Sequence, residues 1–235
     1  MSKGKKYKER NKLIAPDAAT LFTIVDPVST ITEQFRTIRT NILYSSVDKR
    51  TQSMIVTSSG PSEGKSTTAA NLAVAFAQSG MKTILVDADL RRPTVYKTFG
   101  LDNAKGLSSL LSIRRMSLRD VIQESEIRNL DIMPSGPISP NPSEILASPR
   151  MKKAIHILHQ EYDIIIFDVP PVNTVTDAQL IASEVDGALL IVKEEQTEKV
   201  ALENSIKLLE QVDAKVLGAV YFGNLKEQSY GYYQS

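Results

Sequence analysis

The stretch Met54-Ile-Val-Thr-Ser-Ser-Gly-Pro-Ser-Glu-Gly-Lys-Ser-Thr-Thr68 runs from apolar residues, through a loop of small residues, into an alanine-rich helical sequence. Strand, small-residue loop, Gly-Lys-Ser and helix, in that order, are the parts of a phosphate-binding loop. Consecutive loop N–H groups and the helix N-terminus point at one position, which favours an anion. We therefore predict a nucleotide-phosphate site contacted by Ser59, Gly60, Pro61, Ser62, Glu63, Gly64, Lys65, Ser66 and Thr67.

Two residues of this loop carry the expected chemistry. Lys65 is expected to reach the β- and γ-phosphates, and Ser66 to offer its hydroxyl to Mg²⁺. The loop departs from the usual pattern at its first position, where Ser59 stands in place of glycine and Gly60 comes one residue late. The strand before the loop and the helix after it still favour a phosphate site over a simple turn.

Composition limits the classes of protein. The 235 residues carry a formal net charge of +1, which gives no overall field for nucleic acid, so no nucleic-acid partner is expected. The chain has no cysteine, which excludes disulfides, thiol catalysis and Cys-ligated metals. It has no apolar run long enough to span a membrane and no signal-peptide pattern. We expect a soluble cytoplasmic protein, and if it works at a membrane, something else must hold it there.

Beyond the loop, apolar runs alternate with helical patterns. Continuous apolar strands between helices favour an α/β fold with a mostly parallel central sheet, flanked by helices on both faces. The expected strands are 54–56, 83–86, 130–133, 164–167, 188–192 and 216–221, and the expected helices are 31–47, 67–78, 117–123, 150–160, 177–183 and 198–212. We expect one domain over 29–224, a flexible basic arm over 1–28 and a tyrosine-containing tail over 225–235.

Three carboxylates follow two of these strands. Asp87 and Asp89 come after the second apolar run, and Asp168 follows Ile164-Ile-Ile-Phe167. Parallel strands present ligands at their carboxyl ends, so all three face the edge that carries the phosphate loop. We predict that Ser66, Asp87 and Asp168 hold the metal and that Lys65, Asp87 and Asp89 are catalytic, one aspartate orienting or deprotonating an attacking hydroxyl. Taken singly, each aspartate could also be a helix cap.

Two further segments, a charged helix and a tyrosine-containing tail, are candidates for contacts with other chains. Glu33, Arg36 and Arg39 are spaced by three along a predicted helix, which gives either a solvated charged face or a self-complementary subunit contact. Tyr230, Tyr232 and Tyr233 fall in a polar tail that has no core to bury aromatic rings. Those tyrosines could be anchors for a partner, or they could be phosphoryl acceptors, since a flexible tail can enter the active site of another subunit.

These motifs together resemble a known family. They resemble, in order and spacing, the motifs of the bacterial tyrosine kinases of the capsular and exopolysaccharide type. The set comprises the phosphate loop, the segments that carry Asp87 with Asp89 and Asp168, Glu33-x-x-Arg36-x-x-Arg39, Ser135-Gly-Pro-Ile-Ser-Pro-Asn-Pro-Ser-Glu144 and the tyrosine tail. The resemblance runs from about residue 29 to the end and is to the form whose cytoplasmic kinase is a separate chain.

The resemblance implies a P-loop NTPase fold similar to the deviant Walker ATPases, with ATP and Mg²⁺ as cofactors. It implies phosphorylation of the tail tyrosines between subunits of a ring, with Glu33, Arg36 and Arg39 at the ring contact, and in some members phosphorylation of other proteins. A membrane adaptor similar to a polysaccharide chain-length regulator would activate the kinase, and a tyrosine phosphatase would reverse the reaction.

Two departures and two alternatives remain. The tyrosine cluster is short, and Phe222 stands where family members usually carry an asparagine that contacts adenine. One alternative is a partitioning or cell-division switch ATPase, whose loop carries a second lysine that residues 59–63 lack. The other is a nucleotide-sensing regulator without kinase activity.

Overall fold

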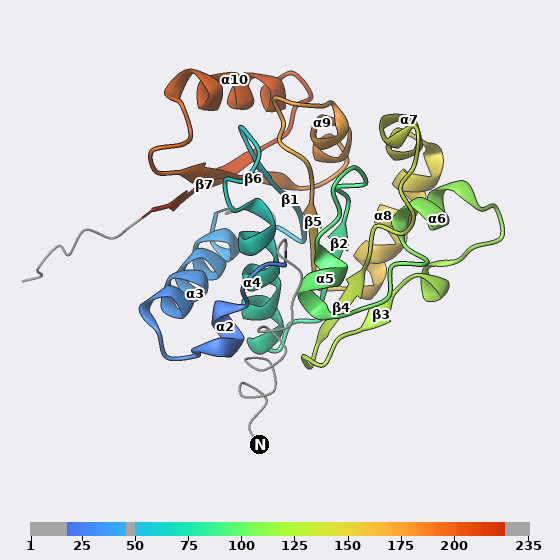
Figure 1. Ribbon diagram of the computed structural model, residues 1–235, viewed down its shortest axis with the longest axis horizontal. Coiled ribbons are helices and arrows are strands. Elements are labelled where there is room, and N and C mark those ends of the chain that lie inside the picture. The colour runs from blue at the N-terminus through green and yellow to red at the C-terminus, as the bar shows by residue number, and fades with distance from the viewer. Residues whose placement is uncertain (1–17, 46–49, 224–235) are drawn as a thin grey trace, which may run out of the picture.

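The computed structural model describes residues 18–45 and 50–223 (Figure 1). Seven strands form one sheet in the order β3-β4-β2-β5-β1-β6-β7. Every pairing is parallel except that of β3 with β4, so the expected mostly parallel sheet is confirmed. The strands are β1 (Ser53–Ser58), β2 (Thr83–Asp87), β3 (Gln123–Glu124), β4 (Leu130–Met133), β5 (Ile164–Asp168), β6 (Gly187–Lys193) and β7 (Val216–Phe222).

Helices cover both faces of the sheet (Figure 1). One face packs against α2 (Phe22–Val25), α3 (Thr30–Leu43), α4 (Lys65–Gln78) and α5 (Val95–Phe99). The other packs against α6 (Leu107–Ser112), α7 (Pro142–Leu146), α8 (Pro149–Glu161), α9 (Asp177–Ala182) and α10 (Lys199–Glu210). Within the described residues, no helix is both long and apolar enough to cross a bilayer.

The central strands read as continuous apolar runs because their side chains feed two cores in turn. In β1, Met54 and Val56 join the cluster around α4, whereas Ile55 joins the cluster around α8 and α9. Side chains of a strand alternate between the two faces of a sheet, so a strand covered on both faces is apolar at every position. Burial on both faces therefore explains the continuous apolar runs in the sequence.

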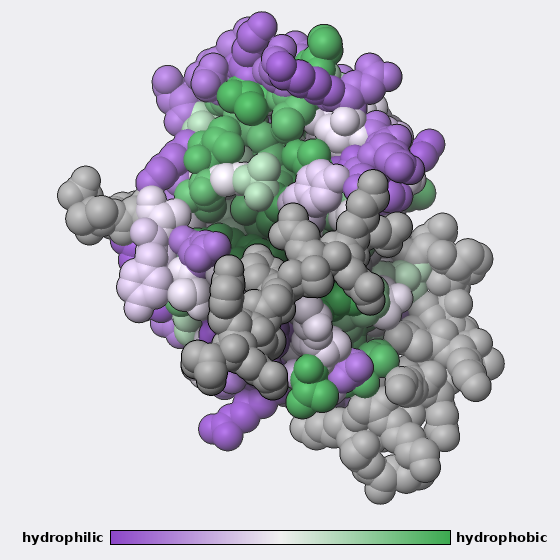
Figure 2. All heavy atoms as spheres, turned by 90° about the vertical axis from the view of Figure 1, so that its left-hand side faces the viewer, coloured by the Kyte–Doolittle hydropathy of each residue, from purple (hydrophilic) through white to green (hydrophobic). Residues whose placement is uncertain are grey.

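The edge strand β7 is less covered. Its neighbour in the sheet is β6 on one side, and Tyr221 on β7 is 64% exposed. Figure 2, which faces this edge, shows apolar side chains gathered beneath the charged residues of α10. Phe222, the last residue of β7, nevertheless turns inward, since its ring carbons lie about as close as 3.5 Å to the position that a Cβ on Gly64 would occupy.

Three expectations about elements need correction. Residues 117–123 are not one helix: a 3₁₀ turn spans Leu118–Asp120, and β3 then pairs with β4. The helix expected over 31–47 is α3, which ends at Leu43. The helices α2, α5 and α6 were not predicted, because runs of four to six residues are too short to show a helical period.

The packed fold also begins before residue 29. Leu21 is buried, and the backbone N–H and hydroxyl of Thr23 both donate to Oδ1 of Asn71 on α4, at 3.1 and 3.2 Å. Residues 18–28 therefore belong to the packed fold, because they supply both apolar burial and buried hydrogen bonds. Residues 1–17 of the expected arm and the expected tail over 225–235 lie outside the described residues.

Candidate active site

The phosphate loop connects β1 to α4 along a backbone that requires glycine at its last position. Gly64 has a φ of 95°, in the left-handed region, and directly precedes Lys65, the first residue of α4. A side chain there would be strained and would also meet the ring of Phe222. The first turn of α4 thus starts at the residue whose side chain is expected to reach the nucleotide.

Serine is accommodated at the first loop position by a buried polar network. The N–H of Ser59 donates to Oε2 of Glu63 at 3.0 Å, and the hydroxyl of Ser205 on α10 donates to Oγ of Ser59 at 2.9 Å. All three residues are buried. The Ser59 hydroxyl therefore has a hydrogen-bonding partner in the buried interior, so the fold accommodates serine where the usual loop has glycine.

The loop is also held from outside by the last residue of β6 and by the turn that follows it. The ammonium of Lys193 donates to the carbonyl of Ser62 at 3.1 Å, and the side-chain amide of Gln196 donates to the carbonyl of Pro61 at 2.8 Å. Reading the sequence did not identify Lys193, Gln196 or Ser205, and no motif signals them. They are brought to the loop by the parallel pairing of β6 with β1.

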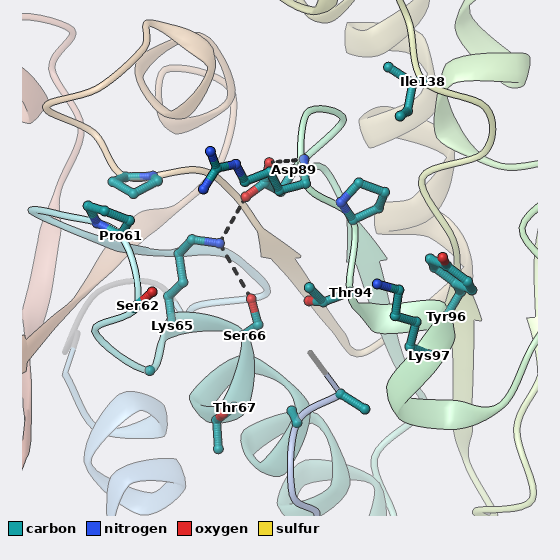
Figure 3. Close-up of a pocket in the computed structure, with 16 residues that line it drawn as sticks. Pro61, Ser62, Lys65, Ser66, Thr67, Asp89, Thr94, Tyr96, Lys97 and Ile138 are labelled. Atoms are coloured by element: carbon teal, nitrogen blue, oxygen red, sulfur yellow. Dashed lines mark hydrogen bonds and ion pairs between the residues drawn. The ribbon is translucent and has the colours of Figure 1, made fainter. Parts of the chain in front are cut away.

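The three predicted aspartates lie near Lys65, and Figure 3 shows the contact of its ammonium with Asp89. The Nζ of Lys65 lies 3.0 Å from Oδ2 of Asp89 and 3.8 Å from Oδ1 of Asp168. Asp87 is paired with Asp168 in the register of β2 and β5, and all three carboxylates are buried. Strand register therefore assembles what the spacing along the chain only suggested.

Burial and the charges of neighbouring side chains shift the pKa values of Asp87, Asp168 and Lys65. Burial raises the pKa of Asp87 well above its ordinary value, and the negative charge of Asp168 adds to the rise. Burial also raises the pKa of Asp168, although the Lys65 ammonium opposes it. Burial by itself lowers the pKa of Lys65, but the attraction of Asp168, Asp89 and Asp87 outweighs it and leaves that pKa raised. A cation is favoured at this position in the fold.

Unsatisfied oxygens show what else fits here. Oδ1 of Asp87 and both carboxylate oxygens of Asp168 are buried without a hydrogen-bonding partner. Hard oxygen ligands are the donors that Mg²⁺ prefers, and the Ser66 hydroxyl lies 3.4 Å from Nζ of Lys65 in the same place. Among the described residues no three acidic or histidine side chains are arranged to hold a metal alone. The set therefore suits an ion that keeps water and phosphate ligands.

A cavity of about 760 Å³ opens from this cluster. Figure 3 shows Lys65, Ser66 and the loop residues on one wall and Tyr96 and Lys97 of α5 on the facing wall. Asp89 lines the cavity, whereas Asp87 and Asp168 do not. Asp89 is thus the one carboxylate of the three that faces the cavity.

The three residues of the predicted oligomer contact do not share one role. Glu33 and Arg36 on α3 form an ion pair with each other, and Nη2 of Arg36 donates to the carbonyl of Pro27 at 3.1 Å. Arg39 instead donates to the carbonyl of Ala75 on α4 at 3.0 Å. Equal spacing put them on one face of the helix, but packing against α4 draws Arg39 aside. Tyr230, Tyr232 and Tyr233 lie outside the described residues.

Comparison with known proteins gives one consistent answer. A family model described as an AAA domain matches residues 54–217. The tyrosine-protein kinase YwqD of Bacillus subtilis is 45% identical over 215 residues, which cover 91% of this chain and 90% of that protein. The putative tyrosine-protein kinase CapB of Staphylococcus aureus is 41% identical over 209 residues, covering 88% and 91%. The kinase domain of the Escherichia coli tyrosine kinase ETK superimposes with a TM-score of 0.85 at 28% identity, covering 100% of this chain and 92% of that one.

Proposed function

Because the chain belongs to the bacterial tyrosine kinases of the capsular and exopolysaccharide type, we propose that it transfers the γ-phosphoryl group of ATP to Tyr230, Tyr232 and Tyr233 of another copy of itself. The observation that carries the proposal is the buried set of Lys65, Asp89 and Asp168 at the end of the phosphate loop. It places an anion-binding loop beside carboxylates that could bind a metal ion and accept the proton of a hydroxyl.

The residues divide into two groups by their proposed role. Ser66, Asp87 and Asp168 are proposed to hold Mg²⁺, since the Ser66 hydroxyl lines the cavity, and one carboxylate oxygen of Asp87 and both of Asp168 are buried without a hydrogen-bonding partner. When bound, Mg²⁺ would neutralise charge on the β- and γ-phosphates. Lys65 is proposed to bind those phosphates, which requires it to exchange part of its contact with Asp89 for phosphate oxygens.

Asp89 is proposed to orient the acceptor and take its proton. It lines the cavity, and it accepts both the Lys65 ammonium and the backbone N–H of Arg92 at 3.0 Å. Because two hydrogen-bond donors fix the Asp89 carboxylate, that carboxylate would be in position to accept the proton of a tyrosine hydroxyl that enters the cavity. Phosphoryl transfer asks of the protein mainly positioning and charge neutralisation, which this arrangement supplies.

The finer parts of the function rest on the family. We infer a homo-oligomeric ring with contacts at Glu33 and Arg36, recruitment to the inner face of the cell membrane by an adaptor similar to a chain-length regulator, and reversal by a tyrosine phosphatase. Other protein substrates fit the same chemistry. Through these steps the kinase would regulate synthesis or export of a capsular or exopolysaccharide.

Mass spectrometry of the purified full chain with ATP and Mg²⁺ tests the proposal. The wild-type chain should gain phosphate on the tail tyrosines, and addition of the adaptor's cytoplasmic segment should increase the yield. Lys65→Met should abolish the gain, whereas Lys207→Gln, which removes a charge from α10, should leave it unchanged. Tyrosine phosphorylation that survives Lys65→Met would overturn the assignment of the site.

A further inference from the structure

Two consecutive carbonyl groups in the middle of the phosphate loop accept hydrogen bonds from outside the cavity. The carbonyl of Pro61 accepts the side-chain amide of Gln196 at 2.8 Å, and the carbonyl of Ser62 accepts the Lys193 ammonium at 3.1 Å. Lys193 is the last residue of β6, and Gln196 lies in the turn between β6 and α10. Pro61 and Ser62 line the cavity (Figure 3), whereas Lys193 and Gln196 do not. The two donors therefore contact the loop from the side that faces away from the nucleotide site.

Because peptide groups are planar, these two contacts also fix the direction of two loop N–H groups. In a trans peptide the C=O of one residue and the N–H of the next point in opposite directions, and the described residues contain no cis peptide. Fixing the carbonyls of Pro61 and Ser62 toward β6 and its turn therefore directs the N–H groups of Ser62 and Glu63 to the opposite side. Within residues 18–45 and 50–223, neither N–H donates a hydrogen bond. Consecutive free N–H groups of this kind bind an anion.

Both segments joined by this contact contain a residue in an unfavourable backbone conformation. Ser62 has a φ of 62°, and Glu195, between Lys193 and Gln196, has a φ of 59°. A residue with a Cβ is disfavoured in the left-handed region, so it persists there only where its surroundings fix it, as they do at ligand clamps. The described part of the chain has four non-glycine residues with a positive φ, and two of them lie in these two segments.

The segment that supplies the two donors is itself fixed to the sheet. The N–H of Lys193 donates to the hydroxyl of Thr197 at 2.8 Å, and the N–H groups of Gln196 and Thr197 donate to the carbonyl of Lys193 at 3.2 and 2.9 Å. The N–H of Glu194 donates to the carbonyl of Phe222, the last residue of β7, at 3.0 Å. Because β6 pairs with both β1 and β7, the strand that leads into the loop and the turn that holds the loop belong to one sheet.

From these contacts, and resting on the nucleotide site of the proposed function, we propose that Lys193 and Gln196 are positioning residues that set the affinity of the loop for the phosphates of ADP and ATP. Neither side chain touches the nucleotide. Each holds one carbonyl outward, so that the N–H groups of Ser62 and Glu63 are already oriented when phosphate oxygens arrive. Binding then does not have to order these two peptide groups, and affinity rises for that reason.

Calorimetric titration of the full chain with ADP and Mg²⁺, and separately with pyrophosphate and Mg²⁺, tests this role. Gln196→Ala removes an uncharged donor and should weaken ADP binding roughly three- to tenfold, the range that one lost hydrogen bond gives. Lys193→Met should weaken it by a similar factor, whereas Lys193→Arg, which keeps a donor and the charge, should retain most of the affinity. Pyrophosphate should lose affinity by the same factor as ADP, because the loop holds the phosphates and not the base.

Lys199→Met and Gln211→Ala are the matched controls, because these exposed residues lie at the two ends of α10 and do not line the cavity. Both controls should leave the two affinities unchanged. An unchanged ADP affinity in either Gln196→Ala or Lys193→Met would overturn the proposal. A loss of the same size in Lys199→Met as in Lys193→Met would assign the effect to charge rather than to the shape of the loop, and would also overturn it.

Steady-state kinetics of tail phosphorylation give a readout that a general loss of structure would not imitate. In Gln196→Ala the KM for ATP should rise while kcat stays near the wild-type value, because Lys65 and Asp89 are unchanged. A fall in kcat with an unchanged KM would contradict a role in phosphate binding. The titrations with ADP and pyrophosphate involve no transfer, so their outcome does not depend on whether the chain is an active kinase. Failure of this proposal and failure of the proposed function are therefore distinguishable.

Discussion

Asp87 is fully buried, and one of its carboxylate oxygens has no hydrogen-bonding partner. Its other oxygen accepts the backbone N–H groups of Thr94 and Val95, at 3.1 and 3.0 Å, which fixes the start of α5. One carboxylate oxygen of Asp87 thus has a structural role, and the other is open to a ligand. A buried charge with an open coordination position is costly without a cation and is expected at a metal site.

Replacing this carboxylate should stabilise the fold and remove activity. Burial and the charge of Asp168 raise the pKa of Asp87, so the folded chain binds a proton more tightly than the unfolded chain. The free energy of unfolding should therefore fall as pH rises from the ordinary aspartate range through the raised pKa. Asp87→Asn, whose amide oxygen can still accept from α5, should raise the unfolding free energy at neutral pH by about 1–2 kcal/mol.

Denaturant unfolding at pH 5 and pH 7.5, with kinase assays alongside, measures both effects. Asp120→Asn is the control of opposite sign, because hydrogen bonds from Ser117 lower the pKa of Asp120 and that carboxylate stabilises its turn. It should not stabilise the chain. An Asp87→Asn chain that is less stable at neutral pH, or that keeps full Mg²⁺-dependent activity, would show that this carboxylate is not a desolvated metal ligand.

Gly64 permits a second prediction about one residue. Alanine there must adopt a left-handed conformation, at a cost of about 1–2 kcal/mol, and its methyl group would also contact Phe222 beside the phosphate loop. Gly80 has a similar φ of 93° but nothing within 4 Å of an added Cβ. Gly64→Ala and Gly80→Ala should thus lose similar stability in denaturant unfolding, and only Gly64→Ala should weaken nucleotide binding. Equal nucleotide affinities would mean that the loop conformation does not shape the site.

At the scale of elements, one arginine joins the segment between β2 and α5 to two helices on the other face of the sheet, α7 and α9. Arg91 connects the segment after β2 to Asp177 on α9 and Ser143 on α7, and Ser143 also donates to Asp177 at 2.6 Å. The loop from Ser135 to Asn141, which carries Ile138, lies between β4 and α7. The segment that leads from β2 into α5 is therefore joined to α7 and α9 through one buried carboxylate.

Breaking this connection should cost stability. Arg91→Gln leaves the buried Asp177 without its charged partner, which should lower the unfolding free energy by about 1–3 kcal/mol. The double variant with Asp177→Asn should recover part of the loss, because the uncompensated buried charge is then gone. Thermal and denaturant unfolding of the single and double variants form the double-mutant cycle. Strictly additive losses would indicate that the pair is not coupled.

Helix α3 shows how tertiary packing divides one sequence motif. Glu33 and Arg36 lie on the exposed side, where an ion pair three residues apart contributes only about 0.2–0.5 kcal/mol. Arg39 caps a carbonyl near the end of α4. A test of the predicted ring contact should therefore use the first two residues and treat Arg39 separately.

For the whole molecule, this yields a prediction about assembly. Glu33→Gln combined with Arg36→Gln should barely change the stability of a single chain but should shift an oligomer toward monomer in sedimentation velocity, with loss of tail phosphorylation. Arg39→Gln should instead lower stability, since it removes the bond to Ala75. An oligomer that is unchanged by the paired substitution would contradict the assignment of this face as the ring contact.

Much of the fold was accessible from the sequence because the strands are buried on both faces. Six apolar runs correspond to β1, β2, β4, β5, β6 and β7, and the loop before Lys65 lies where the motif places it. The two-residue β3 gave no periodic signal, and its first residue, Gln123, fell within the helix predicted over 117–123. Its pairing with β4 is a long-range choice that local propensity does not encode.

The site was predictable in its types of residue and not in its supports. Strand ends supplied Asp87 and Asp168, and motif spacing supplied Lys65 and Ser66. Ser205 and Lys193 lie far along the chain and reach the loop only through sheet order, so no local pattern reports them. The ion pair of Arg91 likewise depends on Asp177, a buried aspartate far along the chain. The predicted roles of the tail tyrosines remain predictions.

The central claim is that Lys65 and its carboxylates in one chain phosphorylate the tail of another. The most direct test mixes a Lys65→Met chain, which keeps its tyrosines, with a chain in which Tyr230, Tyr232 and Tyr233 are Phe but Lys65 is intact. After addition of ATP and Mg²⁺, intact-protein mass spectrometry should find phosphotyrosine on the tail of the Lys65→Met chain, although neither chain labels its own tail when incubated alone. No phosphate on that tail in the mixture, while wild-type chains become labelled, would contradict transfer between subunits.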